Sequence, residues 1–171
     1  MSLKAIHGLS IAVLCVFVGL PTPSIPGSPA DKATGDVLGA PAAHPSWWRY
    51  FEFSAHEKGI VPSGKGELTH YRLNADATEI IREELCEILY VNVEGNSAWF
   101  AGPIIYDSAN VLPLRWIVVH VVDGGQPGAG HDALWWTRVA NETEALYMVE
   151  EKMTPAADLV VQAGNLKVHD R

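Results

Sequence analysis

The stretch "EILYVNVEGNSAWFAGPIIYD", residues 87–107, decides the fold class. In its first half the apolar residues Leu89, Val91 and Val93 alternate with polar or aromatic ones. A period of two residues directs successive side chains to opposite faces of a β-strand. The turn is "EGN" at 94–96, because Gly and Asn tolerate the left-handed backbone that tight hairpins require. The stretch therefore predicts two antiparallel strands joined by a short hairpin.

Similar segments lie on both sides of this hairpin. Each is rich in aromatic and β-branched residues and is bounded by Gly, Asn, Asp or Pro, which is typical of short strands. They are residues 47–55, 64–73, 114–123, 133–140 and 165–170. Residues 114–123 are almost continuously apolar, which predicts a strand covered on both faces. The sequence thus predicts an all-β fold, an antiparallel β-sandwich or flattened barrel of about eight strands.

Two segments carry a helical spacing instead. Residues 76–88 place Ile81, Leu85 and Ile88 on one helical face with acids between them, so the local pattern permits either a helix or a strand. Residues 142–153 show the same spacing, and their glutamate-rich composition suits a helix better than an edge strand. We therefore predict a short helical insertion in the second segment.

The first thirty residues differ from the rest of the chain. Lys4 precedes an apolar run, Leu9–Leu20, and a Pro-, Ser- and Gly-rich stretch that ends at Ala30. This is the layout of a secretory signal peptide. A run of 12 residues is too short to cross a bilayer, which requires about 20, so we expect cleavage after Ala30 and no retained membrane span. The secreted or periplasmic product would contain a flexible leader, 31–45, and a single β domain, 46–171.

Charge and cysteine content exclude several roles. The net charge of −8 argues against nucleic acids and anionic membrane surfaces, because both require a basic footprint. After the signal peptide, Cys86 is the only cysteine, so no intramolecular disulfide can form. Glu83, Glu84 and Glu87 would raise the pKa of a nearby thiol, which predicts a small buried apolar residue and not a reactive nucleophile.

Four motifs in order resemble a group of small secreted bacterial all-β domains without an assigned function. The motifs are "GKGEL" (64–68), "VNVEGNSAWFAG" (91–102), "VVHVVDGGQPGAGHD" (118–132) and "GNLKVHD" (164–170). The group carries a V-x-G-N turn, a D-N-G-E-P-G-x-x-D-like loop and a closing G-N-I-x-V-H. The resemblance implies an exported all-β domain and favours a strand over a helix for residues 76–88. Gly124 and Gln126 stand where the group has Asn and Glu, which weakens a metal site in that loop.

The glycine-rich loop is the nearest approach to a binding motif. Asp123, His131 and Asp132 could supply metal ligands, but calcium takes about six to eight oxygen ligands and the loop lacks the alternating acids of a calcium loop. We prefer a turn, in which Asp123 accepts backbone N–H groups, the glycines supply positive φ and Asp132 closes the hairpin. Zinc is also disfavoured, because the histidines that follow the signal peptide lack the close i, i+2 or i, i+4 spacing of paired ligands: they are His44, His56, His70, His120, His131 and His169.

Catalytic motifs such as G-x-S-x-G and H-E-x-x-H are not found in the sequence, and we predict neither an enzyme nor a cofactor. Glu83 and Glu84 would project to opposite faces of a strand, so they cannot converge on one bond. Each "WW" pair should place one indole inward and one outward, and we assign Trp48 and Trp136 as contacts for a carbohydrate or protein partner, unless the insertion or the leader covers them.

These features predict a non-catalytic exported domain, a structural or interaction module. The alternative is a small-ligand or carbohydrate-binding domain that uses the outward tryptophans or the mouth of a barrel. A hydrolase whose residues meet only in three dimensions is the third hypothesis.

Overall fold

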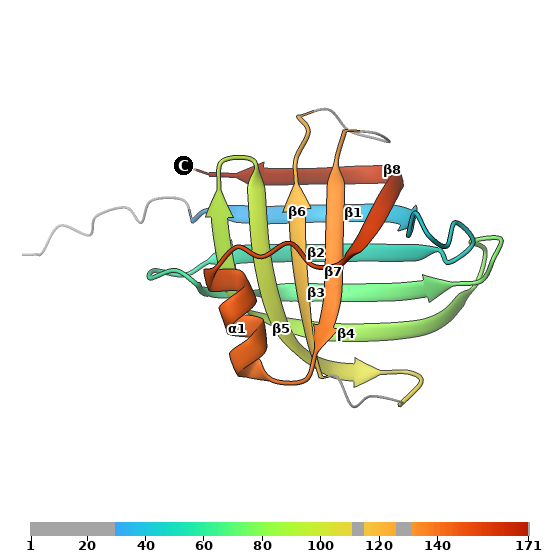
Figure 1. Ribbon diagram of the computed structural model, residues 1–171, viewed down its shortest axis with the longest axis horizontal. Coiled ribbons are helices and arrows are strands. Elements are labelled where there is room, and N and C mark those ends of the chain that lie inside the picture. Colours follow the sequence, from blue (N-terminus) through green and yellow to red (C-terminus); the bar gives the residue numbers. More distant parts are fainter. Residues whose placement is uncertain (1–29, 111–114, 126–130, 171) are drawn as a thin grey trace, which may run out of the picture.

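The computed structural model describes residues 30–110, 115–125 and 131–170. Within them, antiparallel strands pair in chain order and β8 pairs with β1, which closes a barrel (Figure 1). The prediction of an all-β barrel is confirmed. The strands are β1 Lys32–Ala40, β2 Arg49–Glu57, β3 Ser63–Leu73, β4 Ile80–Glu94, β5 Ser97–Asp107, β6 Trp116–Val122, β7 Ala133–Val139 and β8 Ala157–His169, and one helix, α1 Glu142–Glu150, precedes β8.

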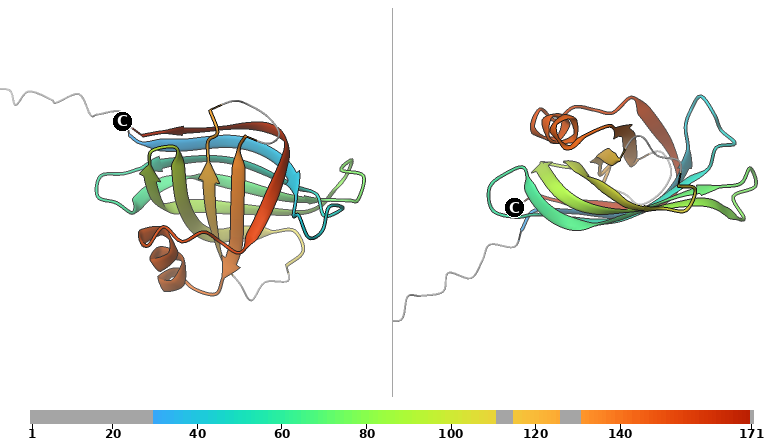
Figure 2. Two further views of the ribbon diagram at one scale, coloured as in Figure 1. Left: turned by 45° about the horizontal axis from the view of Figure 1, so that its top comes forward. Right: turned by 90° about the horizontal axis from the view of Figure 1, so that it is seen from below.

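The barrel is flattened into two crossed layers. Strands β1 to β4 run across one side, and β5, β6 and β7 cross them on the other (Figures 1 and 2). Strand β8 belongs to both layers, because its first residues pair with β7 and its remainder pairs with β1. Its backbone shifts register against β1 at Leu38 and Gly39, which lets the strand turn from one layer to the other.

The main core lies inside the barrel and follows the two-residue period. Phe51 and Phe53 on β2 point inward and meet Phe100 and Trp136 from the opposite layer. The hairpin that decided the fold class is present, with β4 and β5 joined by Gly95 at a φ of 59°. Residues 80–88 belong to β4, so the strand interpretation of that segment is confirmed.

The prediction of a flexible leader over 31–45 is wrong for most of its length. Residues 32–40 form β1, which pairs with both β2 and β8. The inward positions of β1 include Gly35 and Gly39, where a Cβ would lie 2.7 Å from Phe53 Cζ and 2.4 Å from a backbone oxygen of β8. Small residues are needed there, so the strand lacks the apolar alternation that marks its neighbours. The β domain therefore begins at β1 and not at residue 46. The predicted signal peptide, 1–30, lies outside the described residues except for Ala30.

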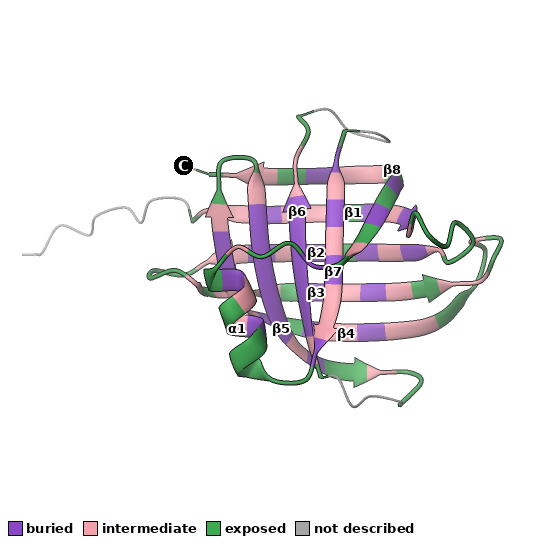
Figure 3. Ribbon diagram, in the orientation of Figure 1, coloured by how far each residue is buried: buried purple, intermediate pink, exposed green. Residues whose placement is uncertain are grey.

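Helix α1 covers the outer surface of β5 and β6. The Asn141 side chain accepts a hydrogen bond from Glu144 N at 3.0 Å and caps the helix. Ala145 and Val149 are buried against Val118 and other outward residues of the barrel. The predicted helical insertion is confirmed, and it explains why β6 is buried along nearly its whole length (Figure 3). No helix among the described residues is long and apolar enough to cross a membrane.

Three aromatic rings stack across the outer face beside this helix. His120 lies between Trp99 and Trp135, with ring centroids 4.3 and 4.9 Å away, and these residues occupy paired positions on β5, β6 and β7. Its Nδ1 lies 3.1 Å from the Thr154 hydroxyl in the segment after α1. Burial lowers the pKa of His120 to about 4, so the ring is neutral at pH 7.

Because His120 is neutral in the folded protein, we expect the free energy of unfolding to fall at acidic pH. The unfolded chain takes up the proton near pH 6.5 but the folded protein only near pH 4, so stability is complete above 6.5 and falls as the pH drops toward 4. Between pH 7 and about pH 4.5, the wild type should lose about 2 kcal/mol more unfolding free energy than His120→Phe. Urea unfolding at both pH values measures this difference. Equal losses in the two proteins would show that His120 protonates equally in the folded and unfolded states.

Candidate ligand-binding site

The glycine-rich loop is a turn in the part that the structure describes. Asp123 accepts hydrogen bonds from Gly125 N at 2.7 Å and Val168 N at 3.1 Å. Asp132 accepts from Gly124 N at 3.1 Å and Leu166 N at 3.3 Å, so both carboxylates bind backbone. His131 is exposed, and no group of three metal-ligating residues occurs among the described residues. The predicted backbone contacts of Asp123 and Asp132 are confirmed, and residues 126–130 of the loop lie outside the described part.

Asp132 should therefore matter for stability and not for metal binding. Its carboxylate is 7 % exposed, so Asp132→Ala leaves two backbone N–H groups without their acceptor and should cost about 1–3 kcal/mol. Its exposed neighbour provides the control, since His131→Ala should cost less than about 0.5 kcal/mol. Chemical denaturation of both variants tests the difference, and equal costs would contradict the assigned role of Asp132.

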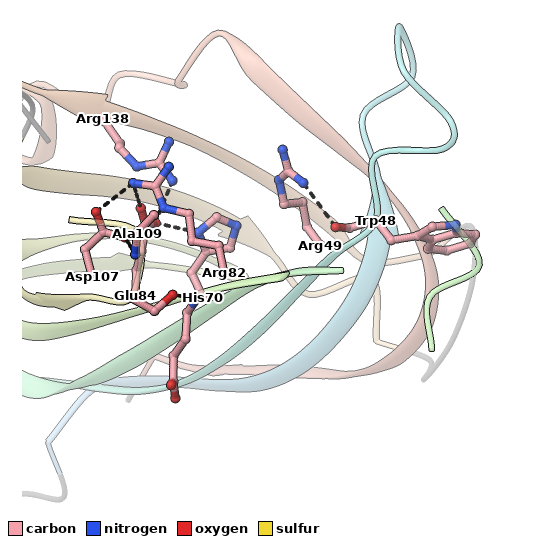
Figure 4. A network of polar contacts seen from close by, with 10 residues as sticks. Trp48, Arg49, His70, Arg82, Glu84, Asp107, Ala109 and Arg138 are labelled. Atoms are coloured by element: carbon pink, nitrogen blue, oxygen red, sulfur yellow. Dashed lines mark hydrogen bonds and ion pairs between the residues drawn. The ribbon is translucent and has the colours of Figure 1, made fainter. Parts of the chain in front are cut away.

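A charged cluster occupies one end of the barrel interior. Glu84 on β4 is fully buried, and its Oε2 lies 2.8 Å from His70 Nδ1 and accepts a hydrogen bond from Arg138. Its Oε1 lies 2.9 Å from Arg82 Nη2, in an ion pair without hydrogen-bond geometry. Arg82 also pairs with Asp107, which joins β4 to the end of β5 (Figure 4). Glu84 thus connects three side chains from β3, β4 and β7.

The antiparallel order brings these residues to the same end. Strands β2, β4 and β6 begin at this end, whereas β3, β5 and β7 finish there. Arg49 is the first residue of β2, and Arg138 is the last but one of β7. The loop between β1 and β2 borders the same end, where the Trp48 indole donates to Ala75 O at 3.1 Å in the β3–β4 loop. We name this region, with Arg49, His70, Arg82, Glu84, Asp107, Trp136 and Arg138, the charged end.

The protonation states follow from burial and from these contacts. Burial lowers the pKa of His70 to about 4, although the hydrogen bond to Glu84 opposes this shift. Burial would raise the pKa of Glu84, but the hydrogen bonds from His70 and Arg138 outweigh it and hold that pKa below its usual value. At neutral pH the pair is therefore a neutral imidazole and a carboxylate. His70 donates through Nδ1, so its Nε2 carries a free lone pair.

Arg49 is a buried cation without an ionic partner. Its side chain is 7 % exposed and donates from Nη1 to Trp48 O at 3.1 Å. Figure 4 shows its guanidinium apart from the Glu84 contacts, and it forms no ion pair with any described residue. Burial, together with the nearby charges of Arg72 and Arg138, lowers the pKa of Arg49 to about 10. The protein itself therefore compensates this charge poorly.

Besides Glu84 Oε1, which is in the ion pair with Arg82, four polar atoms at the charged end have no hydrogen-bond partner within the described protein. They are Arg49 Nε, His70 Nε2, Trp136 Nε1 and Arg138 Nε. Three of the side chains adjoin one another: the Trp136 ring lies 5.0 Å from that of His70, and the Arg138 guanidinium lies 5.0 Å above the Trp136 ring. Arg49 lies near enough to Arg138 for the charge of Arg138 to lower the pKa of Arg49. Buried polar groups in folded proteins are nearly always paired, so four exceptions at one end of the barrel mark this region as unusual.

Of the two tryptophans predicted as ligand contacts, Trp136 belongs to the charged end, whereas the Trp48 indole lies away from the cluster and points to Ala75 (Figure 4). Trp136, however, points inward and is only 8 % exposed, so its predicted outward direction is wrong; its neighbour Trp135 takes the outer face. Trp48 is half-buried in the β1–β2 loop. Contact with a ligand stays a prediction for both. Cys86 lies on β4 two residues after Glu84, is buried as expected, and has its pKa raised to about 12, chiefly by burial.

Sequence reasoning missed the charged residues of this site. Arg49 precedes Phe51 by two residues, and His70 follows Leu68 by two. Glu84 and Arg138 stand in the same relation to Cys86 and Trp136. A charged or polar residue two positions from an inward apolar one shares its face. That signal was present, and Glu84 was correctly placed on the opposite face from Glu83, which is partly exposed.

Comparison with known proteins identified no relative, since no family profile, curated protein or solved structure matches the chain.

Proposed function

We propose that this protein is a non-catalytic binding domain that holds one small polar molecule at the charged end of its barrel. The observation that carries the proposal is the set of four unpartnered polar atoms that β2, β3 and β7 place at this one end of the barrel. A buried donor or acceptor without a partner costs about 1–3 kcal/mol. A molecule that pairs with several of these atoms would recover much of that cost.

The fold supports this proposal. The interior of an eight-stranded barrel is wide enough to be filled by side chains or to hold one small ligand. At the charged end, the exposure of the side chains decreases toward the barrel interior. The side chains of Arg82 and Arg138 are 18 % and 19 % exposed, while those of His70 and Glu84 are 2 % and 0 % exposed. Pairing between β7 and β8 ends at Trp136, so Arg138 lies beyond the last paired position described. A ligand would enter beside Arg138.

The proposed setting is outside the cytoplasm. The layout of residues 1–30 supports export to the periplasm or the medium, and the resemblance to small secreted bacterial domains agrees with it. The protein would then bind its ligand in that compartment, before any uptake. Trp136 would flank the ligand as a flat apolar surface, and contact of Trp48 with the ligand stays a prediction.

A thermal-shift screen of the full chain tests the proposed function. The panel contains small sugars, amino acids, hydroxy acids and neutral amides. A ligand at one hundred times its Kd should stabilise the protein by about 2.7 kcal/mol, a rise in melting temperature of roughly 5–10 °C. The rise should be lost in Arg49→Met and retained in Lys65→Met, an exposed cation near the start of β3, at the opposite end of the barrel. A flat response of the wild type to every compound would overturn the proposal.

An interaction module is the second candidate. It is favoured by large apolar side chains on β4 and β5 near the charged end, where Ile80, Ile81, Ile105 and Tyr106 are 48–65 % exposed. Exposed apolar groups of this kind are common at protein interfaces. Sedimentation velocity over a range of concentrations tests self-association, and Ile105→Lys should abolish any that is observed.

A further inference from the structure

We infer that the molecule bound at the charged end is a small monocarboxylate that also carries a hydroxyl or amino group, held by Arg49 and Arg138 and recognised by His70. This inference rests on the proposed function and specifies its ligand. It follows from the charge balance of the region, from the kinds of atoms left without partners, and from the rings that surround them.

The charge balance favours an anion. Among the side chains that are not exposed, three guanidiniums share the region with two carboxylates and a neutral imidazole: Arg49, Arg82 and Arg138 against Glu84 and Asp107. Arg72 also lies near Arg49, but it is exposed to solvent and is not counted. The region therefore carries one excess positive charge, although the chain as a whole has a net charge of −8. A buried charge without a counterion is strongly unfavourable. The single carboxylate of a hydroxy acid would neutralise the excess, whereas a phosphate monoester with about two charges would exceed it. An amino acid would offer the same carboxylate to the arginines but, as a zwitterion, would leave the net charge unchanged.

The unpartnered atoms fit the same ligand. Three of them, Arg49 Nε, Trp136 Nε1 and Arg138 Nε, are N–H donors. A carboxylate accepts several hydrogen bonds through two oxygens, and the planar guanidinium suits it in geometry as well as in charge. Burial and the positive charges of neighbouring arginines lower the pKa of Arg49 to about 10. A bound anion would stabilise the charged form of this side chain.

The fourth unpartnered atom, His70 Nε2, requires a hydrogen-bond donor on the ligand. His70 Nδ1 is committed to Glu84 at 2.8 Å, so Nε2 can only accept. A hydroxyl or ammonium group near the carboxylate would supply that donor. The ring of His70 is fixed on its other side, because it stacks on Phe51 with centroids 4.5 Å apart and lies 5.0 Å from Trp136. These rings limit the ligand to a small molecule.

Isothermal titration of the full chain with matched acids and amides tests the inference. The probes are lactate, glycerate, serine and gluconate, each compared with its primary amide, which keeps the size and the hydroxyl but removes the charge. At least one acid should bind about 10- to 100-fold more tightly than its amide, as expected for hydrogen bonds to a charged group. The same compound without its hydroxyl or amino group, such as propionate for lactate, should bind about tenfold more weakly, because His70 Nε2 then stays unpaired.

Variants locate the binding and separate the two proposals. Arg49→Met should weaken the acid at least tenfold and leave the amide unchanged, while Lys65→Met, at the opposite end of the barrel, should leave both unchanged. Arg49→Lys keeps the positive charge but lacks the planar guanidinium, so its affinity for the acid should lie between those of the wild type and Arg49→Met. This variant gives a second test if Arg49→Met does not fold. Amides that bind as tightly as their acids, or acid binding that survives both substitutions of Arg49, would overturn the inference and leave the proposed function standing. Failure of every acid and amide, together with a flat thermal-shift screen, would remove both.

Discussion

Glu84→Gln should lower the free energy of unfolding by about 3–5 kcal/mol. The Glu84 carboxylate is fully buried and contacts two arginines and a histidine. Glutamine preserves the shape but removes the negative charge, so Arg138 loses its ionic partner and Arg82 keeps only Asp107. Removing one member of a buried ion pair costs much more than the pair contributes, because the remaining charges stay buried.

The adjacent glutamate supplies the control. Glu83 has the same chemistry and neighbouring backbone, but it projects to the outer face and is partly exposed. Glu83→Gln should therefore cost less than about 1 kcal/mol. Urea unfolding at pH 7, followed by circular dichroism, measures both variants. If the two substitutions cost the same, the ion pairs around Glu84 do not contribute to stability as we describe.

The β hairpin at residues 87–107 could be predicted because its pattern is local. Val91 and Val93 face the core, although a register shift between Cys86 and Tyr90 places Ile88 and not Leu89 on the same face. The pairing of Glu94 with Ser97 follows from a two-residue turn at Gly95 and Asn96. The turn role of Asp123 was predictable for the same reason, since an Asp before a glycine accepts nearby backbone N–H groups. Patterns of this kind need no knowledge of distant partners.

Strand β1 could not be predicted because partners far away in the chain decide it. Gly35 lies under Phe53, 18 residues away in the sequence, and Gly39 lies against Leu159 on β8. Glycine normally weakens a strand, so local propensity argues against one here. The close approach of β2 and β8 selects small residues, and that approach exists only in the closed barrel.

The charged end was missed for a related reason. Its members are spread from Arg49 to Arg138, and each resembles a solvated residue near a strand terminus when read alone. Inward direction could be inferred from neighbours such as Phe51, but the meeting of His70 with Glu84 depends on the register between β3 and β4. Convergence of five strands is a property of the barrel order and not of any segment.

Removal of β1 should abolish cooperative folding. A chain that begins at Pro41 lacks the strand that pairs with β2 on one side and β8 on the other. The closed barrel would then have two open edges, and core residues such as Phe53 and Leu166 would lose their cover. The cost should exceed the total stability of an ordinary domain, about 5–15 kcal/mol.

A chain that begins at Asp31 keeps β1 and serves as the control. It should unfold in one sharp transition, with a free energy within about 1 kcal/mol of the full chain. Differential scanning calorimetry should show a cooperative peak for this chain and none for the chain that begins at Pro41. Binding of the carboxylate probes gives a second readout. Arg49 is the first residue of β2, and β2 pairs with β1, so loss of β1 should also abolish binding at the charged end. A cooperative peak in the shorter chain would mean that β2 and β8 can close the barrel without β1, and the eight-stranded closure would then not be what places Arg49 beside Arg138.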